Sequence, residues 1–255
     1  MKLLEGKKVL VLGVANDMSI AWGITKLLKA HGAHVALTYL NENLKKRVEP
    51  LANEVEADFI TEMDVTIDGH YAELRKTVEA KWGKFDVLVH SLAFADKNDL
   101  KSNFTDTSRE GFKMACDISA FSLVGLCHHL SDLMNPGGSI MAMTYHGSTK
   151  VLKGYNVMGV AKAALEASAR YLADDLGPKG LKVNCISAGP IRTLAASGVP
   201  GLKEYLKAIE EKAPMRKNVS QDDVAGTALY LASSLSNGVT GQVLYVDSGM
   251  SIIAH

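Results

Sequence analysis

The segment YNVMGVAK, residues 155–162, contains two side chains that could act in one chemical step. Tyr155 can donate a proton or a hydrogen bond, and a nearby cation such as Lys162 would lower the pKa of its hydroxyl. On one helix, seven positions turn through about 700° and put both residues on the same face, about 10 Å apart. A second tyrosine, Tyr145 in MAMTYHG, is an alternative acid, and an ordinary amphipathic helix would carry a similar pair.

Strands and helices that could position these residues alternate along the chain. Seven short apolar segments, rich in β-branched residues, predict strands. They lie at 7–13, 34–40, 58–65, 84–93, 137–145, 181–189 and 241–249. Amphipathic helical patterns lie between them, for example at 19–32, 70–83 and 161–180. This alternation predicts a single α/β domain over 1–255, a doubly wound Rossmann domain with a seven-stranded parallel sheet and helices on both faces.

Composition narrows the class of protein. The 255 residues include 28 basic and 28 acidic side chains, so the chain lacks an overall basic character that would favour nucleic acid. Cys116, Cys127 and Cys185 show no C-x-x-C spacing and are expected to be buried in a reducing compartment. Nothing in the sequence offers a metal cluster, and no apolar run approaches membrane-spanning length. We expect a cytoplasmic protein without a nucleic-acid or membrane partner.

The turn after the first strand, in VLGVANDMSIAWGI, lacks the central glycine of the G-x-G-x-x-G dinucleotide fingerprint. The physical requirements for binding are still present. Gly13 permits a tight turn, and Ser19 or Asp17 can cap the following helix. The N–H groups at that helix N-terminus would suit a pyrophosphate. A structural turn without a ligand is the alternative.

The ends of the second and third strands would meet the adenosine half of a dinucleotide. No arginine or lysine occupies the turn after Leu40, which favours NADH over NADPH. Glu42 would bind the ribose or, equally well, begin a helix capped by Asn41. Asp64 would accept a hydrogen bond from the adenine amino group while Val65 packs on the ring, or Asp64 would serve only as a turn residue.

Two further strand ends complete the expected binding edge. HSLAFA, residues 90–95, carries small side chains that would let a cofactor lie close, and His90 is expected to be a packing residue. The irregular segment from Ser187 to about Val199 follows the sixth strand. Parallel sheets bind ligands at the carboxyl ends of their strands, so a long loop there is a candidate binding element.

Together with the Tyr-x6-Lys spacing, GVANDMSIAWG and ISAGPIRTLAASG make the sequence resemble the bacterial enoyl-acyl-carrier-protein reductases of type II fatty-acid synthesis. These belong to the short-chain dehydrogenase/reductase superfamily. The resemblance covers nearly the whole chain, from LEGKKVLVLGVAN to VDSGMSI. Met158 stands four residues before Lys162, where the ordinary superfamily motif Y-x-x-x-K has tyrosine. Two alternatives remain open at this point: a carbonyl reductase or alcohol dehydrogenase of the same superfamily, and a non-catalytic dinucleotide-binding sensor.

The resemblance implies NADH-dependent reduction of the carbon–carbon double bond of a trans-2-enoyl thioester on acyl carrier protein, the last step of fatty-acid elongation. Tyr155 would hydrogen-bond the thioester carbonyl, Lys162 would hold the nicotinamide ribose, and Tyr145 would have an auxiliary role by the substrate. Ala95 matches a substrate-contacting position. The implied cofactor-contacting positions are Gly13, Ser19, Ile20, Leu40, Asp64, Val65, Ser91, Leu92, Lys162, Ile191, Arg192, Thr193, Leu194 and Ala195.

The resemblance also carries expectations about assembly and motion. Family members are homotetramers, and the apolar C-terminal segment VDSGMSIIAH would pack against a neighbouring subunit. A mobile lid is expected around 190–210, with a static surface loop as the alternative. The helix in GLKEYLKAIE would form one wall of an acyl-chain pocket. His146, directly after Tyr145, is expected to be exposed.

Overall fold

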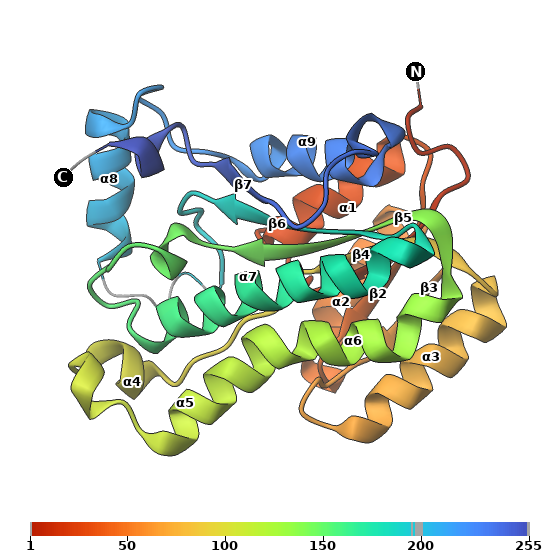
Figure 1. The fold of residues 1–255 in the computed structure, drawn as a ribbon, viewed down its shortest axis with the longest axis horizontal. Helices are drawn as coiled ribbons and strands as arrows, with labels where there is room; N and C mark the ends of the chain where they lie inside the picture. Colours follow the sequence, from red (N-terminus) through yellow and green to blue (C-terminus); the bar gives the residue numbers. More distant parts are fainter. Residues whose placement is uncertain (1, 195, 197–200, 254–255) are drawn as a thin grey trace.

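Seven strands form one parallel sheet in the order β3-β2-β1-β4-β5-β6-β7 (Figure 1). Their bounds are β1 Lys8–Leu12, β2 His34–Tyr39, β3 Phe59–Glu62, β4 Phe85–His90, β5 Met134–Thr144, β6 Lys182–Ala188 and β7 Val243–Val246. The computed structural model describes residues 2–194, 196 and 201–253. The strand order reverses between β1 and β4, which makes their carboxyl ends a topological switch point. The predicted parallel sheet is confirmed.

One strand is longer than the sequence pattern indicates. β5 begins at Met134, three residues before the predicted start at 137. The turn-forming pair Pro136-Gly137 hides this beginning, because it reads as a loop. In the structure Met134 pairs with Phe85 of β4 before a shift in register, so the pair lies within the strand as an irregularity.

Helices cover both faces of the sheet (Figure 1). α1, α2 and α9 pack on one face, and α3, α6 and α7 pack on the other. The bounds are α1 Ile20–Ala30, α2 Glu42–Glu54, α3 Asp68–Trp82, α4 Lys97–Lys101, α5 Arg109–Cys116, α6 Ser122–Leu130, α7 Val157–Leu176, α8 Leu202–Lys212 and α9 Gln221–Ala232. α4 and α8 stand at the end of the molecule toward which β5 and β6 point. In the described part of the chain, no helix combines the length and apolar character needed to cross a membrane.

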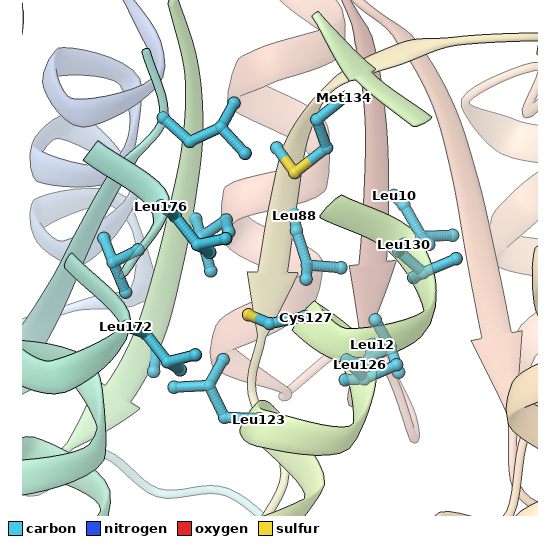
Figure 2. Close-up of a cluster of buried hydrophobic side chains, with 14 of the residues drawn as sticks. Leu10, Leu12, Leu88, Leu123, Leu126, Cys127, Leu130, Met134, Leu172 and Leu176 are labelled. Carbon is cyan, nitrogen blue, oxygen red and sulfur yellow. The ribbon is translucent and has the colours of Figure 1, made fainter. Parts of the chain in front are cut away.

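Alternate residues of the central strands build two separate hydrophobic layers. Val9 and Val11 of β1 face the α1, α2 and α9 layer, whereas Leu10 and Leu12 face the opposite layer. Figure 2 shows Leu10, Leu12 and Leu88 beside leucines of α6 and α7. These helix residues are Leu123, Leu126, Leu130, Leu172 and Leu176. Complete burial of one such leucine contributes about 1.5–3 kcal/mol, so this layer holds α7 firmly against the sheet.

We expect Leu88→Ala to lower the free energy of unfolding by about 2–5 kcal/mol, because truncation leaves a cavity in this closed layer. Leu88 is fully buried. Leu235→Ala removes the same atoms from a side chain that is 64% exposed and should change stability by less than about 0.5 kcal/mol. Urea unfolding followed by circular dichroism measures both values. Equal losses in the two variants would contradict this account of the core.

Candidate active site

The centre of the candidate site is the close approach of the ends of β1 and β4. Gly13 follows β1 with a φ of 103°, in the region that favours glycine. A Cβ atom at this position would lie 2.1 Å from the carbonyl oxygen of Ser91, which follows β4. Only glycine fits there, and it lets the backbones after β1 and β4 approach this closely. Both residues are among the predicted cofactor positions.

The loop that follows Gly13 is held by Ser19, in a way that differs from the prediction. Ser19 does occupy the N-cap position of α1, but it makes no side-chain cap hydrogen bond to the helix. Its Oγ instead accepts hydrogen bonds from the backbone N–H groups of Ala15 at 3.0 Å and Asn16 at 3.2 Å. The serine therefore shapes the loop, and no side chain caps the first turn of α1, which starts at Ile20.

A residue that the sequence analysis missed also supports this loop. Gln221, the first residue of α9, donates from Nε2 to the carbonyls of Asp17 at 3.1 Å and Ser19 at 2.8 Å. A Cβ on Gly23 would lie 2.6 Å from Cβ of Gln221, so α1 and α9 approach closely. Gly23 thus serves helix packing. No local pattern marks Gln221, because 202 positions separate it from Ser19.

The turn after β2 has the features of one of the two alternatives for Glu42, in which it begins a helix capped by Asn41. Asn41 caps α2 by accepting a hydrogen bond from the N–H of Leu44 at 3.1 Å. Glu42 begins the helix and pairs with Lys45 at 3.3 Å. Lys45 also lies over the ring of Tyr39, 5.6 Å from its centroid. Leu40 is 43% exposed, so its side chain offers an apolar surface at the end of the strand.

The residues after β3 form a turn. Oδ1 of Asp64 accepts hydrogen bonds from Thr66, from its N–H at 2.9 Å and from its hydroxyl at 2.7 Å. The carbonyl of Val65 accepts from the hydroxyl of Tyr71 at 2.9 Å, and the Val65 side chain is buried. Asp64 therefore has the turn role; its contact with adenine, like that of Val65, stays a prediction.

Tyr155 does not lie on a helix, which corrects the geometric argument from spacing. It occupies a turn, in which its N–H donates to the carbonyl of Leu152 at 3.1 Å. α7 begins only at Val157, two residues after Tyr155, and includes Lys162. The break lies at Asn156, whose φ is 41° and ψ −121°. Helical periodicity therefore does not relate the tyrosine to the lysine.

The two tyrosines nevertheless meet at the carboxyl end of β5. The rings of Tyr145 and Tyr155 contact edge to face, with centroids 5.0 Å apart. A Cβ on Gly147 would lie 2.5 Å from the Tyr155 ring, so this glycine permits the close packing. His146 is buried, with its ring 4.8 Å from that of Tyr145. The expectation that His146 is exposed was wrong, because the chain turns inward after β5.

Lys162 of α7 places a buried ammonium group at the ends of β4 and β5. Nζ donates to the carbonyl of Met143 at 2.8 Å and lies 3.5 Å from that of Leu92. These two contacts join α7 to the ends of β5 and β4. Burial lowers the pKa of Lys162 to about 8, although the nearby carboxylate of Glu166 opposes that shift. The ammonium is thus the main form at neutral pH.

Glu166 is a buried acid that the sequence analysis did not single out. It stands one helical turn beyond Lys162 on α7, and its Oε1 accepts a hydrogen bond from Oγ1 of Thr144 at 2.6 Å. Thr144 is the last residue of β5 and precedes Tyr145. Lys162 and Glu166 consequently hold two successive residues of the β5 end. The spacing of four positions was visible in the sequence, but burial of the acid was not.

The hydroxyls of both tyrosines retain their protons at neutral pH. Burial raises the pKa of Tyr155, and the neighbouring Tyr145 and Glu166 add to this effect. Burial also raises the pKa of Tyr145, with further contributions from Tyr205 and Asp247. The expectation that a cation lowers the pKa of Tyr155 was wrong, because burial raises it and Lys162 is not among the groups that shift it. The site therefore presents neutral phenols, which can donate hydrogen bonds.

The remaining predicted positions lie around this centre. Ser91 and Leu92 follow β4 and are half-buried. Ala95 packs in a small cluster with Tyr155 and Leu100. Beyond β6, Ile191 packs against the α1 and α9 layer, Arg192 is exposed, Thr193 accepts a hydrogen bond from the N–H of Ala196 at 3.0 Å, and Leu194 is 47% exposed. Ala195 lies outside the described residues.

His90 packs in the interior, as expected. It is fully buried, and its Nε2 lies 2.7 Å from Oγ of Ser122. Burial lowers its pKa to about 3, with the charge of Lys162 adding to the shift, so it is neutral at physiological pH. Within the described part of the chain, no three His, Cys, Asp or Glu side chains gather where they could hold a metal ion.

Known proteins match this chain from end to end. The family model for Enoyl-(Acyl carrier protein) reductase matches residues 13–251. An enoyl-[acyl-carrier-protein] reductase [NADH] of Rickettsia typhi is 50% identical, with 99% of this chain and 97% of the relative aligned. One from Rhizobium meliloti is 51% identical, over 97% of this chain and 91% of the relative.

Solved structures agree with the sequence matches. The Bacillus cereus enoyl-acyl carrier protein reductase, solved with NADP+ and indole naphthyridinone, superposes with a TM-score of 0.98 at 47% identity over the full length of both chains. The Anaplasma phagocytophilum reductase, in complex with NAD, gives a TM-score of 0.94 at 44% identity, covering 99% of this chain and 95% of that one. The chain therefore belongs to the enoyl-acyl-carrier-protein reductase family.

Proposed function

We propose that the chain reduces the carbon–carbon double bond of trans-2-enoyl thioesters carried by acyl carrier protein, with NADH as reductant, in the last step of fatty-acid elongation. One observation carries the proposal: two neutral tyrosines and a buried lysine converge at the carboxyl ends of β4 and β5. Family membership supports the same activity. The carbonyl reductase and the silent sensor are not favoured, because the relatives are named as enoyl reductases.

The residues at the switch point fit a dinucleotide. Gly13 permits the close approach of the ends of β1 and β4, and the first turn of α1 has backbone N–H groups that no side chain caps. Those N–H groups would hold the pyrophosphate, and Lys162 would hold the nicotinamide ribose. When bound, the nicotinamide supplies the hydride. Contacts from Ile20 and from the segment 191–195 belong to the same proposal.

The turn after β2 favours NADH over NADPH. A 2′-phosphate on the adenosine ribose would approach the carboxylate of Glu42, which repels it. The nearest lysine, Lys45, is already engaged by Glu42 and by the ring of Tyr39. Several relatives carry NADH in their names. The NADP+ in the Bacillus cereus complex is a property of that protein.

Tyr155, supported by Tyr145, would stabilise the negative charge that develops on the thioester oxygen. Addition of hydride at the β-carbon puts negative charge on the thioester oxygen, and protonation at the α-carbon completes the reduction. The Tyr155 hydroxyl donates a hydrogen bond to that oxygen, which stabilises the enolate. Its raised pKa suits this role, because the phenol keeps its proton. Tyr145 supports the Tyr155 ring by edge-to-face contact and so has the smaller effect.

The proposed organisation is a single domain spanning 1–255, with a lid around 190–210. Helix α8 would form one wall of the acyl-chain pocket. A cleft of about 500 Å³ separates α8 from the end of α4. Leu100, Gly154 and Tyr205 line it, and the hydroxyl of Tyr205 lies 3.4 Å from the carbonyl of Lys153. Gly154 directly precedes Tyr155, so this cleft would receive the acyl chain. Residues 195 and 197–200 of the proposed lid lie outside the described part.

The decisive assay mixes the protein with NADH and a short trans-2-enoyl thioester and follows the absorbance of the reduced nicotinamide. We expect oxidation of NADH that depends on the thioester. Ketone and aldehyde substrates under the same conditions serve as the comparison. Turnover of ketones without turnover of the thioester would overturn the proposed function, and NADH binding without any turnover would favour a sensor.

Tyr155→Phe should reduce kcat by about 10²–10³-fold, because it removes one hydrogen-bond donor to the developing oxyanion. Tyr145→Phe keeps the ring contact and should cost less than about tenfold. Steady-state kinetics at saturating NADH gives both values, and the Kd for NADH should stay close to that of the parent protein. If Tyr145→Phe costs as much as Tyr155→Phe, the two roles are assigned wrongly.

The Lys162 ammonium predicts an alkaline limb in the pH profile. Above a pKa of about 8 the group becomes neutral and holds the ribose hydroxyls less strongly, so kcat/KM for NADH should fall as the pH rises through 8. This parameter reports the free enzyme, which is the state described here. Kinetics between pH 6 and 9.5 measure the limb.

Glu166→Gln serves as the matched test of this assignment. Glutamine can still accept the hydrogen bond from Thr144, but it lacks the charge that opposes the fall in the pKa of Lys162. The alkaline limb should therefore move to lower pH. A limb that stays in place in Glu166→Gln would show that another group titrates.

Two separate apolar surfaces support a homotetramer. On the helical face, the exposed residues are Phe112 of α5, Phe121 just before α6, and Tyr171 of α7. Tyr245 on the edge strand β7 and the nearby Ile252 are exposed along a different side. Two isologous contacts made by different surfaces generate a closed assembly of four copies.

Multi-angle light scattering should give the mass of four 27.4 kDa chains, about 110 kDa. Tyr171→Glu puts a charge on the helical surface and should halve the mass, because only the other contact remains. Leu235→Glu, in the exposed turn after α9 and in neither group of residues, is the control that should leave the mass unchanged. A monomeric parent protein would overturn this assembly.

The proposed location is the cytoplasm. Cys116, Cys127 and Cys185 are all free thiols, which is typical of a reducing compartment. NADH and acyl carrier protein, the proposed co-substrate and substrate carrier, are available there.

A further inference from the structure

Asn156, the residue after Tyr155, has a backbone conformation that asparagine adopts only under constraint. Its φ of 41° and ψ of −121° match the second position of a type II′ turn, where glycine is preferred. Such strained residues persist where surrounding contacts hold them, and they gather at functional sites. The conformation separates the Tyr155 turn from α7, so it sets the direction from which the phenol enters the site.

The side chain of Asn156 supplies contacts that can hold this conformation. Its Nδ2 donates to the carbonyls of Ser102 at 2.8 Å and Asp99 at 3.0 Å, with that of Leu100 at 3.4 Å. These carbonyls belong to the C-terminal end of α4, where a helix leaves acceptors without partners. One amide therefore ties Tyr155 to a helix more than fifty positions earlier in the chain.

The α4 end is itself firmly supported. The buried carboxylate of Asp99 accepts hydrogen bonds from the N–H of Ser108 at 2.8 Å and from its hydroxyl at 3.1 Å. Ser108 caps α5, and a Cβ on Gly111 in the first turn would lie 1.7 Å from the Asp99 carboxylate. The carbonyls that Asn156 contacts thus belong to a rigid support.

The same support packs against the tyrosine. Leu100 forms a small hydrophobic cluster with Val157, Met158 and Ala161 of α7, and Tyr155 packs against it. On the other side, Gly147 permits contact with the Tyr155 ring. The ring is therefore confined from two sides, while its backbone depends on the turn at Asn156.

We propose that Asn156 is a positioning residue for Tyr155: its amide ties the turn to the end of α4 and so aims the phenol hydroxyl at the thioester oxygen. The inference rests on the proposed role of Tyr155. Without the tie, the turn is no longer anchored to the end of α4, so the segment that carries Tyr155 can shift and displace its hydroxyl even when the turn keeps its φ and ψ. A misplacement of about 1 Å can cost about 10²-fold in rate.

Asn156→Gly is the sharpest test, because glycine accepts the backbone conformation and removes only the amide. We expect kcat to fall by about tenfold or more, while the Kd for NADH in the binary complex stays within about twofold. Asn135→Ala is the matched control: it removes an amide bonded to Asp86 at the opposite end of the sheet and should leave kcat unchanged. Unchanged kcat in Asn156→Gly would overturn the proposal.

A double-mutant cycle separates positioning of Tyr155 from general stability. In the Tyr155→Phe background, Asn156→Gly should cost less than about a further twofold, because the hydroxyl that it positions is gone. Losses that simply multiply would overturn the proposal. If the parent protein fails to reduce the thioester, the proposed function itself has failed; if Tyr155→Phe keeps full activity, the proposed role of Tyr155 has failed and this inference with it.

Hydrogen exchange provides a readout that needs neither substrate nor cofactor. In Asn156→Gly, amides of segments 97–102 and 155–159 should exchange faster than in the parent protein, and those of β1 should not change. If both segments exchange at the same rate in Asn156→Gly as in the parent protein, the Asn156 hydrogen bonds do not hold the turn, and the proposal is overturned. If Asn156→Gly does not fold, Asn156→Ser, which can reach at most one carbonyl, takes its place in every comparison.

Discussion

The buried ammonium of Lys162 is the interaction on which the rest of the site depends. A charge away from water is costly unless polar groups surround it, and here the carbonyls of Met143 and Leu92 supply that environment. Both carbonyls belong to the ends of neighbouring strands, so α7, β5 and β4 must meet at one point. Thr144 and Glu166 add a second contact one helical turn away. The position of Tyr145 follows, because it directly succeeds Thr144.

The part of the site at the end of β1 depends on Gly13, because glycine has no side chain. Gly13 lets the end of β1 approach the backbone of Ser91, and no other residue would fit. α9 then supports the following loop through Gln221, which contacts two carbonyls before α1. The sheet places the two regions side by side because β1 and β4 are neighbours. A dinucleotide would span both, from the N-terminus of α1 to Lys162.

Burial is the common cause of the protonation states of Tyr145, Tyr155 and Lys162. Removal from water disfavours the charged form of every group, so it raises the pKa of both tyrosines and lowers that of Lys162. At neutral pH the site accordingly combines neutral phenols with an ammonium. Neutral donors beside a fixed cation suit a reaction in which negative charge appears on one oxygen and then disappears.

The sequence by itself determined the seven strands, the parallel sheet and the family, because these depend on local patterns. Periodicity of apolar residues predicts elements, and short motifs such as GVANDMSIAWG mark one family. Predictions from the sequence were wrong in three places: β5 starts earlier, His146 is buried, and Tyr155 lies in a turn before the helix. Only the tertiary structure decided that Asn156 breaks the helix and that Gln221 and Glu166 support the site. These roles arise from contacts between segments far apart in the chain or from burial, and neither property is encoded in the spacing of nearby residues.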